Sequence, residues 1–273
     1  MRLWSLGSGS KGNALLVECG DTRVLVDAGF PARTLAARLV AIGVEPSSIT
    51  ACVVTHEHID HVRGAGVAQA KWGWALHASG GTVRESEHLC DSVVNEFSAG
   101  ATLSIGRADI TTVGVSHDAT EPVGLVITDR ASGARAAIVY DLGAVTSEVR
   151  CAVRDVDVLV IEANHDVGML RSGPYPRYLQ ARIASRSGHL SNRDSAALCA
   201  DAAHGSMSHV VLAHLSETNN EPELATTTVA GALGRTRFRG KVSAAAQHAP
   251  VGPFCAKHAR MPAVQQLQLQ LQL

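Results

Sequence analysis

A group of side chains able to bind a metal follows directly on a short β-branched run. Residues 50–54 predict a buried strand, and His56, His58, Asp60 and His61 follow it at once. An extended segment places side chains two residues apart on the same side, so His56 and His58 can face one point. Asp60 and His61 come where the chain turns into a helix, so they can face a neighbouring point. The alternative, a solvated polar loop, is disfavoured because these groups repel one another when the histidines are protonated.

One segment cannot complete two metal sites, so further ligands are expected at other strand ends. Three polar residues come just after predicted strands: His117 after 109–115, Asp141 after 136–140 and His214 after 210–213. Their shared position predicts a common rim in the folded chain. Imidazole nitrogen and carboxylate oxygen suit Zn²⁺ and also accept Mn²⁺ or Fe²⁺, so we expect two divalent cations, with zinc favoured. Six histidines lack this position and are interpreted as surface or core residues: His77, His88, His204, His209, His248 and His258.

Strand patterns alternate with helix patterns in both halves of the chain, with a division near residue 120. The predicted strands cover 2–6, 14–18, 23–26, 50–54, 109–115, 124–128, 136–140, 156–161 and 210–213. The predicted helices cover 34–42, 61–71, 146–153, 176–185, 192–203 and 222–233. This alternation predicts an α/β fold with two β layers face to face and helices outside. No linker divides the halves, so residues 1–250 are expected to form one domain, followed by a C-terminal extension, 251–273, with a poorly ordered Gln/Leu tail.

The composition excludes several classes of protein. A formal net charge of −1 means that the molecule as a whole is not an electropositive nucleic-acid binder. Apolar residues make up 46% of the chain, which provides a sizeable core and excludes a disordered protein. No apolar run approaches the roughly 20 residues of a membrane span, and the first residues lack the apolar region of a secretory signal. The six cysteines form no Cys-x-x-Cys pair, so reduced thiols in a cytoplasmic protein are expected.

A Gly-x-Gly-x-x-Gly run at 7–12 matches the dinucleotide-binding fingerprint, but its context does not fit. That fingerprint needs a helix to begin at the loop, with its N-terminus toward a pyrophosphate. Another strand pattern, 14–18, follows here instead. We therefore interpret the run as a loop at the rim of a site, which offers backbone N–H groups and the hydroxyls of Ser8 and Ser10.

These residues resemble the ligand motif of the metallo-β-lactamase-fold hydrolases. The resemblance spans about residues 1–250 and rests on Thr55-His56-Glu57-His58-Ile59-Asp60-His61, followed in order by His117, Asp141 and His214. It implies an αββα four-layer sandwich with two metal ions at the edge between the β layers. It further implies that one metal is held by His56, His58 and His117, that the second is held by Asp60, His61 and His214, and that Asp141 bridges them.

Five segments resemble the YycJ/WalJ-type branch of this superfamily, bacterial proteins described as 5′→3′ DNA exonucleases. They are 8–13 (Ser-Gly-Ser-Lys-Gly-Asn), 26–29 (Val-Asp-Ala-Gly), 162–166 (Glu-Ala-Asn-His-Asp), 188–192 (Gly-His-Leu-Ser-Asn) and 214–220 (His-Leu-Ser-Glu-Thr-Asn-Asn). From the first segment we expect Ser10, Lys11 and Asn13 to contact the substrate. Secreted zinc-dependent β-lactamases often carry a cysteine where this chain has Asp141, and they have signal peptides, so antibiotic hydrolysis is not expected.

Glu162 and His189 lie in segments similar to motifs of the tRNA 3′-processing members, where such a pair is thought to assist the leaving group. The predicted catalytic residues are therefore Asp60, Glu162 and His189, with His189 as proton donor. The alternative for His189 is a cap on the helix that begins near Asn192. The chain shows no long exosite insertion like that of the tRNA enzymes. It also has no room between Asp141 and His214 for the additional domain of the β-CASP enzymes, which cleave RNA.

A basic patch supplies the clue to the substrate. The segment 171–193 contains five arginines and no Asp or Glu, with Tyr175 and Tyr178 interleaved. Guanidinium groups bind phosphate oxygens in pairs, and tyrosine rings stack on unpaired bases. We therefore expect Arg177, Arg182 and Arg186 to contact nucleic acid. The alternative is a solvated helix face whose arginine stems cover apolar surface.

The sequence thus favours a dinuclear metal-dependent phosphodiesterase that hydrolyses nucleic acid, as a 5′→3′ DNA exonuclease. Two alternatives stay open. One is a hydrolase of the same fold that acts on a small thioester, lactone or cyclic phosphodiester, and the other is a metal-binding sensor without turnover. No membrane partner is expected, and the sequence decides neither the oligomeric state nor DNA against RNA at the level of the 2′-hydroxyl.

Overall fold

Two seven-stranded β-sheets pack face to face in the computed structural model, which describes residues 1–256. The first sheet has the order β14-β1-β2-β3-β4-β5-β6. Its strands are β1 (Arg2–Gly7), β2 (Ala14–Cys19), β3 (Thr22–Val26), β4 (Ala51–Val53), β5 (Ala75–Ser79), β6 (Val94–Phe97) and β14 (Val251–Cys255). The second sheet has the order β13-β12-β11-β10-β9-β8-β7. Its strands are β7 (Thr102–Ile105), β8 (Ala108–Gly114), β9 (Val123–Asp129), β10 (Arg135–Val139), β11 (Val158–Glu162), β12 (His209–Ala213) and β13 (Lys241–Ala244).

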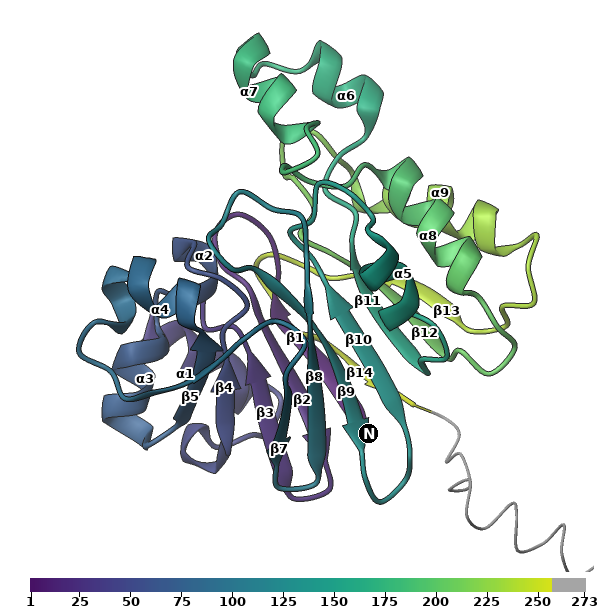
Figure 1. Cartoon of the computed structure of the whole chain (residues 1–273). Coiled ribbons are helices and arrows are strands. Elements are labelled where there is room, and N and C mark those ends of the chain that lie inside the picture. The colour runs from purple at the N-terminus through teal and green to yellow at the C-terminus, as the bar shows by residue number, and fades with distance from the viewer. Residues whose placement is uncertain (257–273) are drawn as a thin grey trace, which may run out of the picture.

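Helices cover the outer face of each sheet, which gives four layers (Figure 1). The first sheet is flanked by α1 (Ala32–Ala41), α2 (Ile59–Val62), α3 (Ala65–Trp72) and α4 (Gly80–Glu85), with 3₁₀ turns at Pro46–Ser48 and Glu87–Leu89. The second sheet is flanked by α5 (Ser147–Ala152), α8 (Asn192–Ala202) and α9 (Pro222–Leu233). Helices α6 (Val167–Ser172) and α7 (Arg177–Ile183) stand apart at the top of Figure 1, and residues 166–188 are called the arm below. The predicted αββα sandwich is confirmed.

Three apolar layers hold the sandwich together, and the period of the strands explains them. In β11, Val158 and Val160 lie in the core between the two sheets, whereas Leu159 and Ile161 pack toward the outer helices. Side chains alternate along a strand, so a strand covered on both faces must be apolar throughout. Burial of each such side chain contributes about 1.5–3 kcal/mol. This packing gives the residues at the strand ends a rigid support.

The parallel strands determine where a site can form. Strands β3 to β6 are mutually parallel, and so are β10 to β13. In parallel sheets, ligands bind in the crevice outside the carboxyl ends of the strands. The loops after β3, β4, β10, β11 and β12 carry most of the candidate site residues. Helix α2 lies at this edge, beneath the arm (Figure 1).

Two predicted boundaries need correction. The sheets divide between Phe97 and Thr102, rather than near residue 120, because the β7–β8 hairpin already belongs to the second sheet. The helix predicted over 61–71 is broken into α2 and α3 at Gly64. The N–H group of Gly64 donates to Ala28 O (2.7 Å), and a Cβ there would lie 2.2 Å from Phe30 O. This close approach of the backbone of residues 28–30 leaves no room for a side chain.

The predicted domain end at residue 250 is too early. Strand β14 pairs antiparallel with β1 (Leu3 opposite Phe254), so residues 251–255 belong to the first sheet. The Gln/Leu tail predicted at the C-terminus lies outside the described residues. Within residues 1–256, no helix combines the length and apolarity needed to cross a membrane. The cytoplasmic location stays a prediction.

Candidate metal centre

Sharp turns at the strand ends present several of the candidate ligands. Asp27, Asp141 and His214 come at the ends of β3, β10 and β12, and their φ angles are 61°, 52° and 53°. This left-handed backbone is uncommon for residues other than glycine, although Asp and His adopt it more often than most. It costs on the order of 1–2 kcal/mol per residue and recurs at functional sites, where the surroundings impose it. The packed sheets impose it here.

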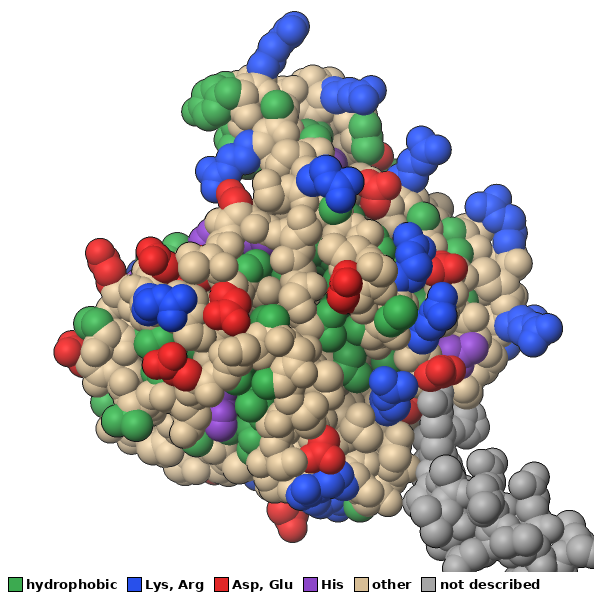
Figure 2. Space-filling model, viewed as in Figure 1, with side chains coloured by type: hydrophobic (Ala, Val, Ile, Leu, Met, Phe, Trp, Pro, Cys, Tyr) green, Lys and Arg blue, Asp and Glu red, His purple; other side chains and the backbone are tan. Residues whose placement is uncertain are grey.

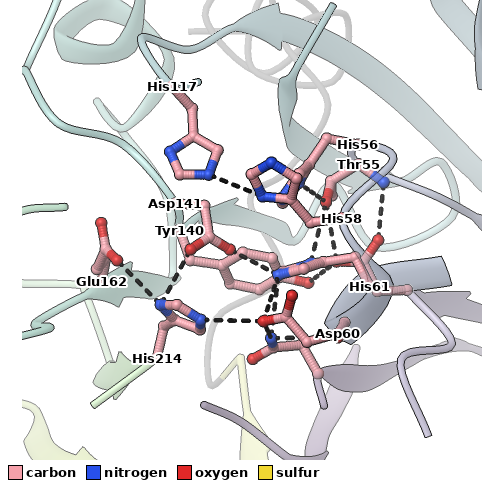
Figure 3. A network of polar contacts seen from close by, with 12 residues as sticks. Thr55, His56, His58, Asp60, His61, His117, Tyr140, Asp141, Glu162 and His214 are labelled. Carbon is pink, nitrogen blue, oxygen red and sulfur yellow. Dashed lines mark hydrogen bonds and ion pairs between the residues drawn. The ribbon is translucent and has the colours of Figure 1, made fainter. Parts of the chain in front are cut away.

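The seven residues predicted as metal ligands lie together at this edge (Figure 3). Their ligand atoms form three overlapping groups, each within 4.8 Å: His56, His58 and His117; Asp60, His61 and His214; and His56, His61 and Asp141. Asp141 Oδ2 lies 2.8 Å from His61 Nε2, and Asp141 Oδ1 lies 2.9 Å from His214 Nδ1. The overlap describes two adjacent positions that could each hold a cation, with Asp141 next to both.

Asp27 orients His61 directly and His56 through Thr55. It is fully buried, and its Oδ2 accepts hydrogen bonds from His61 Nδ1 (2.7 Å), Tyr140 Oη (2.6 Å) and Thr55 Oγ1 (2.9 Å). A carboxylate only accepts, so His61 carries a proton on Nδ1 and directs Nε2 into the cluster. The Thr55 hydroxyl gives its proton to Asp27 and therefore accepts from His56 Nδ1 (3.1 Å), which directs His56 Nε2 the same way.

The donor set fits a divalent metal. His56 Nε2 is buried and has no hydrogen-bond partner within residues 1–256. A buried polar atom left without a partner costs about 1–3 kcal/mol, and a cation would supply that partner. His117 Nδ1 donates to Gly188 O (3.1 Å), so the unprotonated His117 Nε2 faces His58 Nδ1 at 3.3 Å. Converging ring nitrogens with carboxylates beside them are the ligands that zinc and similar ions prefer.

The carboxylates control the protonation of the cluster. Burial alone would lower the pKa values of His61 and His214, but the carboxylates around them, Asp141 above all, raise both well above the usual range. Burial likewise opposes the charge on Asp141, yet His214 and His61 hold the pKa of Asp141 well below its usual range. A cation that enters must therefore displace protons from His61 and His214.

Glu162 and His189 adjoin the same cluster. His189 Nδ1 lies 2.7 Å from Glu162 Oε1 and 3.2 Å from Asp141 Oδ1. Burial works against the charged imidazole, but Glu162 and Asp141 together raise the pKa of His189 to about 9. The alternative role as a helix cap does not apply, because Ser191 caps α8 and accepts from the N–H of Asp194 (3.2 Å).

The glycine-rich loop runs directly into β2, as predicted, and its three candidate residues lie in different environments. Asn13 is buried, and its Nδ2 lies 3.2 Å from Asp60 Oδ2, so it supports a candidate ligand from behind. Ser10 lines a cavity of about 240 Å³ over the cluster. Lys11 is exposed and forms an ion pair with Glu217 (2.6 Å). Ser10 and Lys11 are thus open to a ligand, whereas Asn13 is not.

The predicted basic patch lies on the arm and the start of α8, where Figure 2 shows Lys and Arg side chains in blue. Arg182 Nε donates to Asp118 Oδ2 (2.9 Å), and Asp118 Oδ1 lies 3.3 Å from His117 Nε2. Arg182 is therefore paired with an acidic side chain next to the ligand cluster. The guanidinium groups of Arg177 and Arg186 have no acidic partner within the described part of the chain.

The sequence reasoning gave no role to Asp27, Thr55, Tyr140 or Asp118. Asp27 belongs to the 26–29 segment and directly follows a predicted strand, which is the same signal that indicated His117 and the other ligands. The expectation that polar residues just after predicted strands belong to the site could therefore have included Asp27. The same expectation applies to Thr55, which directly follows the predicted strand 50–54, whereas no local pattern distinguishes Tyr140 or Asp118.

Comparison with known proteins agrees with this geometry. Residues 22–215 match the family model described as "Beta-lactamase superfamily domain". The chain belongs to this superfamily. As a member it is a metal-dependent hydrolase, and members typically bind divalent metals.

Two superfamily relatives are similar over most of their length. The chain is 35% identical to exodeoxyribonuclease YycJ of Bacillus anthracis, over 85% of this chain and 89% of the relative. It is 36% identical to exodeoxyribonuclease WalJ of Streptococcus pneumoniae, over 84% of this chain and 87% of the relative. The solved structure of YhfI from Bacillus subtilis, a metallo-β-lactamase fold protein, superposes with a TM-score of 0.71 at 16% identity and covers 92% of this chain and 99% of YhfI. These matches confirm the resemblance to the YycJ/WalJ-type branch and the fold.

Proposed function

We propose that this superfamily member is a dinuclear metal-dependent phosphodiesterase that degrades DNA as a 5′→3′ exonuclease. The observation that supports it most is the double group of ligand atoms with His189 beside it. The names of the two relatives, both exodeoxyribonucleases, favour DNA as the substrate. Zinc is the favoured metal, since imidazole nitrogens dominate the ligand set, and Mn²⁺ or Fe²⁺ are the alternatives.

His56, His58 and His117 would hold one cation, Asp60, His61 and His214 the other, and Asp141 would bridge them. Bound at such a site, two divalent cations lower the pKa of water and neutralise charge on a phosphate. The chain contributes the orientation of the ligands. Asp27 and Thr55 keep the Nε2 lone pairs of His61 and His56 directed inward.

His189 would donate the proton to the departing sugar oxygen. Its Nδ1 is held by Glu162 Oε1, so its Nε2 is the nitrogen that can face a substrate. Burial opposes the charge, but Glu162 and Asp141 raise the pKa of His189 to about 9 before any cation binds, which favours the doubly protonated ring that a proton donor needs. General acid catalysis of this kind contributes about 10²–10⁴-fold to the rate. Glu162 is a positioning residue, because it acts through His189.

The arm would bind the polymer. Arg177 and Arg186 have no ion-pair partner among residues 1–256, so their guanidinium groups are available for phosphate oxygens. Tyr178 is 76% exposed on α7, where its ring can stack on an unpaired base. Arg182 is held by Asp118, so it would shape the rim rather than bind phosphate with a free guanidinium group.

The test is digestion of 5′- and 3′-labelled DNA and RNA by protein loaded with Zn²⁺, Mn²⁺ or Fe²⁺. Release of the 5′ label from DNA, lost in Asp60→Ala, is the expected result. A protein that cleaves neither polymer with any of these metals contradicts the proposal. A steep loss of DNA binding between 50 and 200 mM salt would further separate a nuclease from a hydrolase of small molecules.

A further inference from the structure

A second cavity adjoins the candidate metal centre. It has a volume of about 550 Å³ and lies between the arm and the start of α8. His189 lines both this cavity and the smaller one over the cluster. Pockets for small ligands typically measure about 300–1,000 Å³, so the second cavity can hold one small molecule but not a duplex.

One side of this cavity carries unpaired positive charge. Arg171 lies in the last turn of α6 and Arg177 begins α7, and both line the cavity. Neither guanidinium group forms an ion pair within residues 1–256. Two free guanidinium groups at one pocket favour a phosphate, whose oxygens match their paired N–H groups.

A buried imidazole lines the same cavity. His165 is only 3% exposed, and its Nδ1 has no hydrogen-bond partner among the described residues. Its backbone oxygen accepts from the N–H of Asn192 (2.8 Å), which fixes its position beside α8. Burial lowers the pKa of His165, so the ring is neutral and offers one donor and one acceptor. Asp194 also lines the cavity, where its Oδ2 accepts from Ser191 Oγ (2.6 Å), so that side disfavours a second anion.

The rest of the wall is aliphatic. Val167 and Leu170 of α6 and Ala181 of α7 line the cavity, together with Ala184 just after that helix. A sugar or a base presents apolar surface to such a wall and polar atoms at its edge. The combination of an aliphatic wall, a neutral imidazole and two arginines therefore matches a nucleotide better than a bare inorganic anion.

We propose that this cavity binds the terminal nucleotide of the nucleic acid, with its phosphate on Arg171 and Arg177 and its base or sugar beside His165 and the aliphatic wall. This inference rests on the proposed function and deepens it. Because the pocket holds a single nucleotide and His189 lies at its edge, the phosphodiester bond that is cut would be the one that joins the terminal nucleotide to the rest of the strand. The enzyme would therefore release mononucleotides.

Calorimetric titration of the full chain with deoxyadenosine monophosphate, deoxyadenosine and inorganic phosphate tests the pocket. We expect the monophosphate to bind at least about tenfold more tightly than either of the other two. Only the monophosphate has both a phosphate for the two arginines and a nucleoside for the aliphatic wall. Arg171→Gln and Arg177→Gln should each weaken binding about ten- to hundredfold. Ala181→Phe, at an exposed position on the cavity wall, should abolish binding without removing a charge. The matched control is Arg193→Gln, which removes an arginine of the same patch outside the cavity and should leave binding unchanged.

Equal binding of inorganic phosphate and the nucleotide would overturn the assignment, and so would an equal loss in Arg193→Gln and Arg171→Gln. Hydrolysis of bis(4-nitrophenyl) phosphate by the zinc-loaded protein separates the two proposals. Turnover of this diester without binding of the monophosphate refutes the pocket and leaves the phosphodiesterase. Binding of the monophosphate by a protein that cleaves no diester refutes the phosphodiesterase and leaves the pocket.

Discussion

Asp27→Asn tests how the fold orients the candidate ligands. The buried carboxylate of Asp27 accepts hydrogen bonds from His61, from Tyr140, and from both the hydroxyl and the N–H of Thr55. Asparagine has almost the same shape, and it tolerates the left-handed backbone at this position, where φ is 61°. The substitution therefore removes a charge and one acceptor atom without moving the chain.

The expected loss has two parts. Three donors converge on Oδ2 of Asp27, and each loses about 1 kcal/mol when its acceptor becomes neutral, or about 3 kcal/mol together. The new amide NH₂ group then faces the N–H of Thr55, and such a buried donor without an acceptor costs about 1–3 kcal/mol more. The free energy of unfolding should thus fall by about 4–6 kcal/mol.

Urea denaturation at pH 7 measures this loss. For a chain of this size, Tm should drop by about 2–4 °C per kcal/mol. Zinc affinity should fall about 10–100-fold, because a neutral amide oxygen orients His61 less firmly than the carboxylate does. Tyr140→Phe is the matched control, since it removes one donor and leaves the carboxylate, and it should cost about 1–2 kcal/mol. If Asp27→Asn costs less than about 1 kcal/mol and binds zinc as well as the unmodified chain, Asp27 does not orient the site.

Zinc affinity should rise steeply from about pH 6 to 8, because the raised pKa values of His61 and His214 mean that zinc must displace their protons. Calorimetry in buffers of different ionisation enthalpy counts those protons, and a pH-independent affinity would contradict the account. Asp129→Asn should cost about 2 kcal/mol at pH 7. Burial opposes the charge on Asp129, but hydrogen bonds lower its pKa overall. Its contribution is therefore complete above the unfolded pKa of about 4 and disappears as the pH falls through the lower folded value, so the free energies of unfolding of the two proteins should converge as the pH falls below about 4. Gly143→Ala should detach the arm, since its Cβ would lie 2.4 Å from Gly188 N, and tryptic cleavage after Arg186 should accelerate, whereas an unchanged cleavage rate would show that the arm is anchored elsewhere.

The elements that the sequence did not reveal share a physical cause. Among the strands of residues 1–256, five were not predicted, and four of them, β6, β7, β13 and β14, are the edges of the two sheets. An edge strand is covered on fewer sides, so its sequence carries a weaker apolar pattern. Strand β13 contains no fully buried residue at all. By contrast β11, whose five residues are all buried, was predicted directly from its apolar run.

The candidate site shows the same division between local and distant information. The choice of His56, His58, Asp60 and His61 followed from residue type and strand position, which are local properties. The arginines illustrate the opposite case. Arg177 and Arg182 look alike in the sequence, yet Arg182 is paired with Asp118, which lies 64 residues away in the chain.

Residue types and strand patterns were enough to predict the fold class, the side chains available to bind a metal, and their positions at the strand ends. The packing of the two sheets set which ligand atoms lie within 4.8 Å of one another, which carboxylate accepts from His61 and which side chains line each cavity. The physical reason is that strand period and ligand chemistry are set by neighbours along the chain, whereas contacts such as Ser8 Oγ with the N–H of His214, 206 residues apart, exist only once the two sheets have packed.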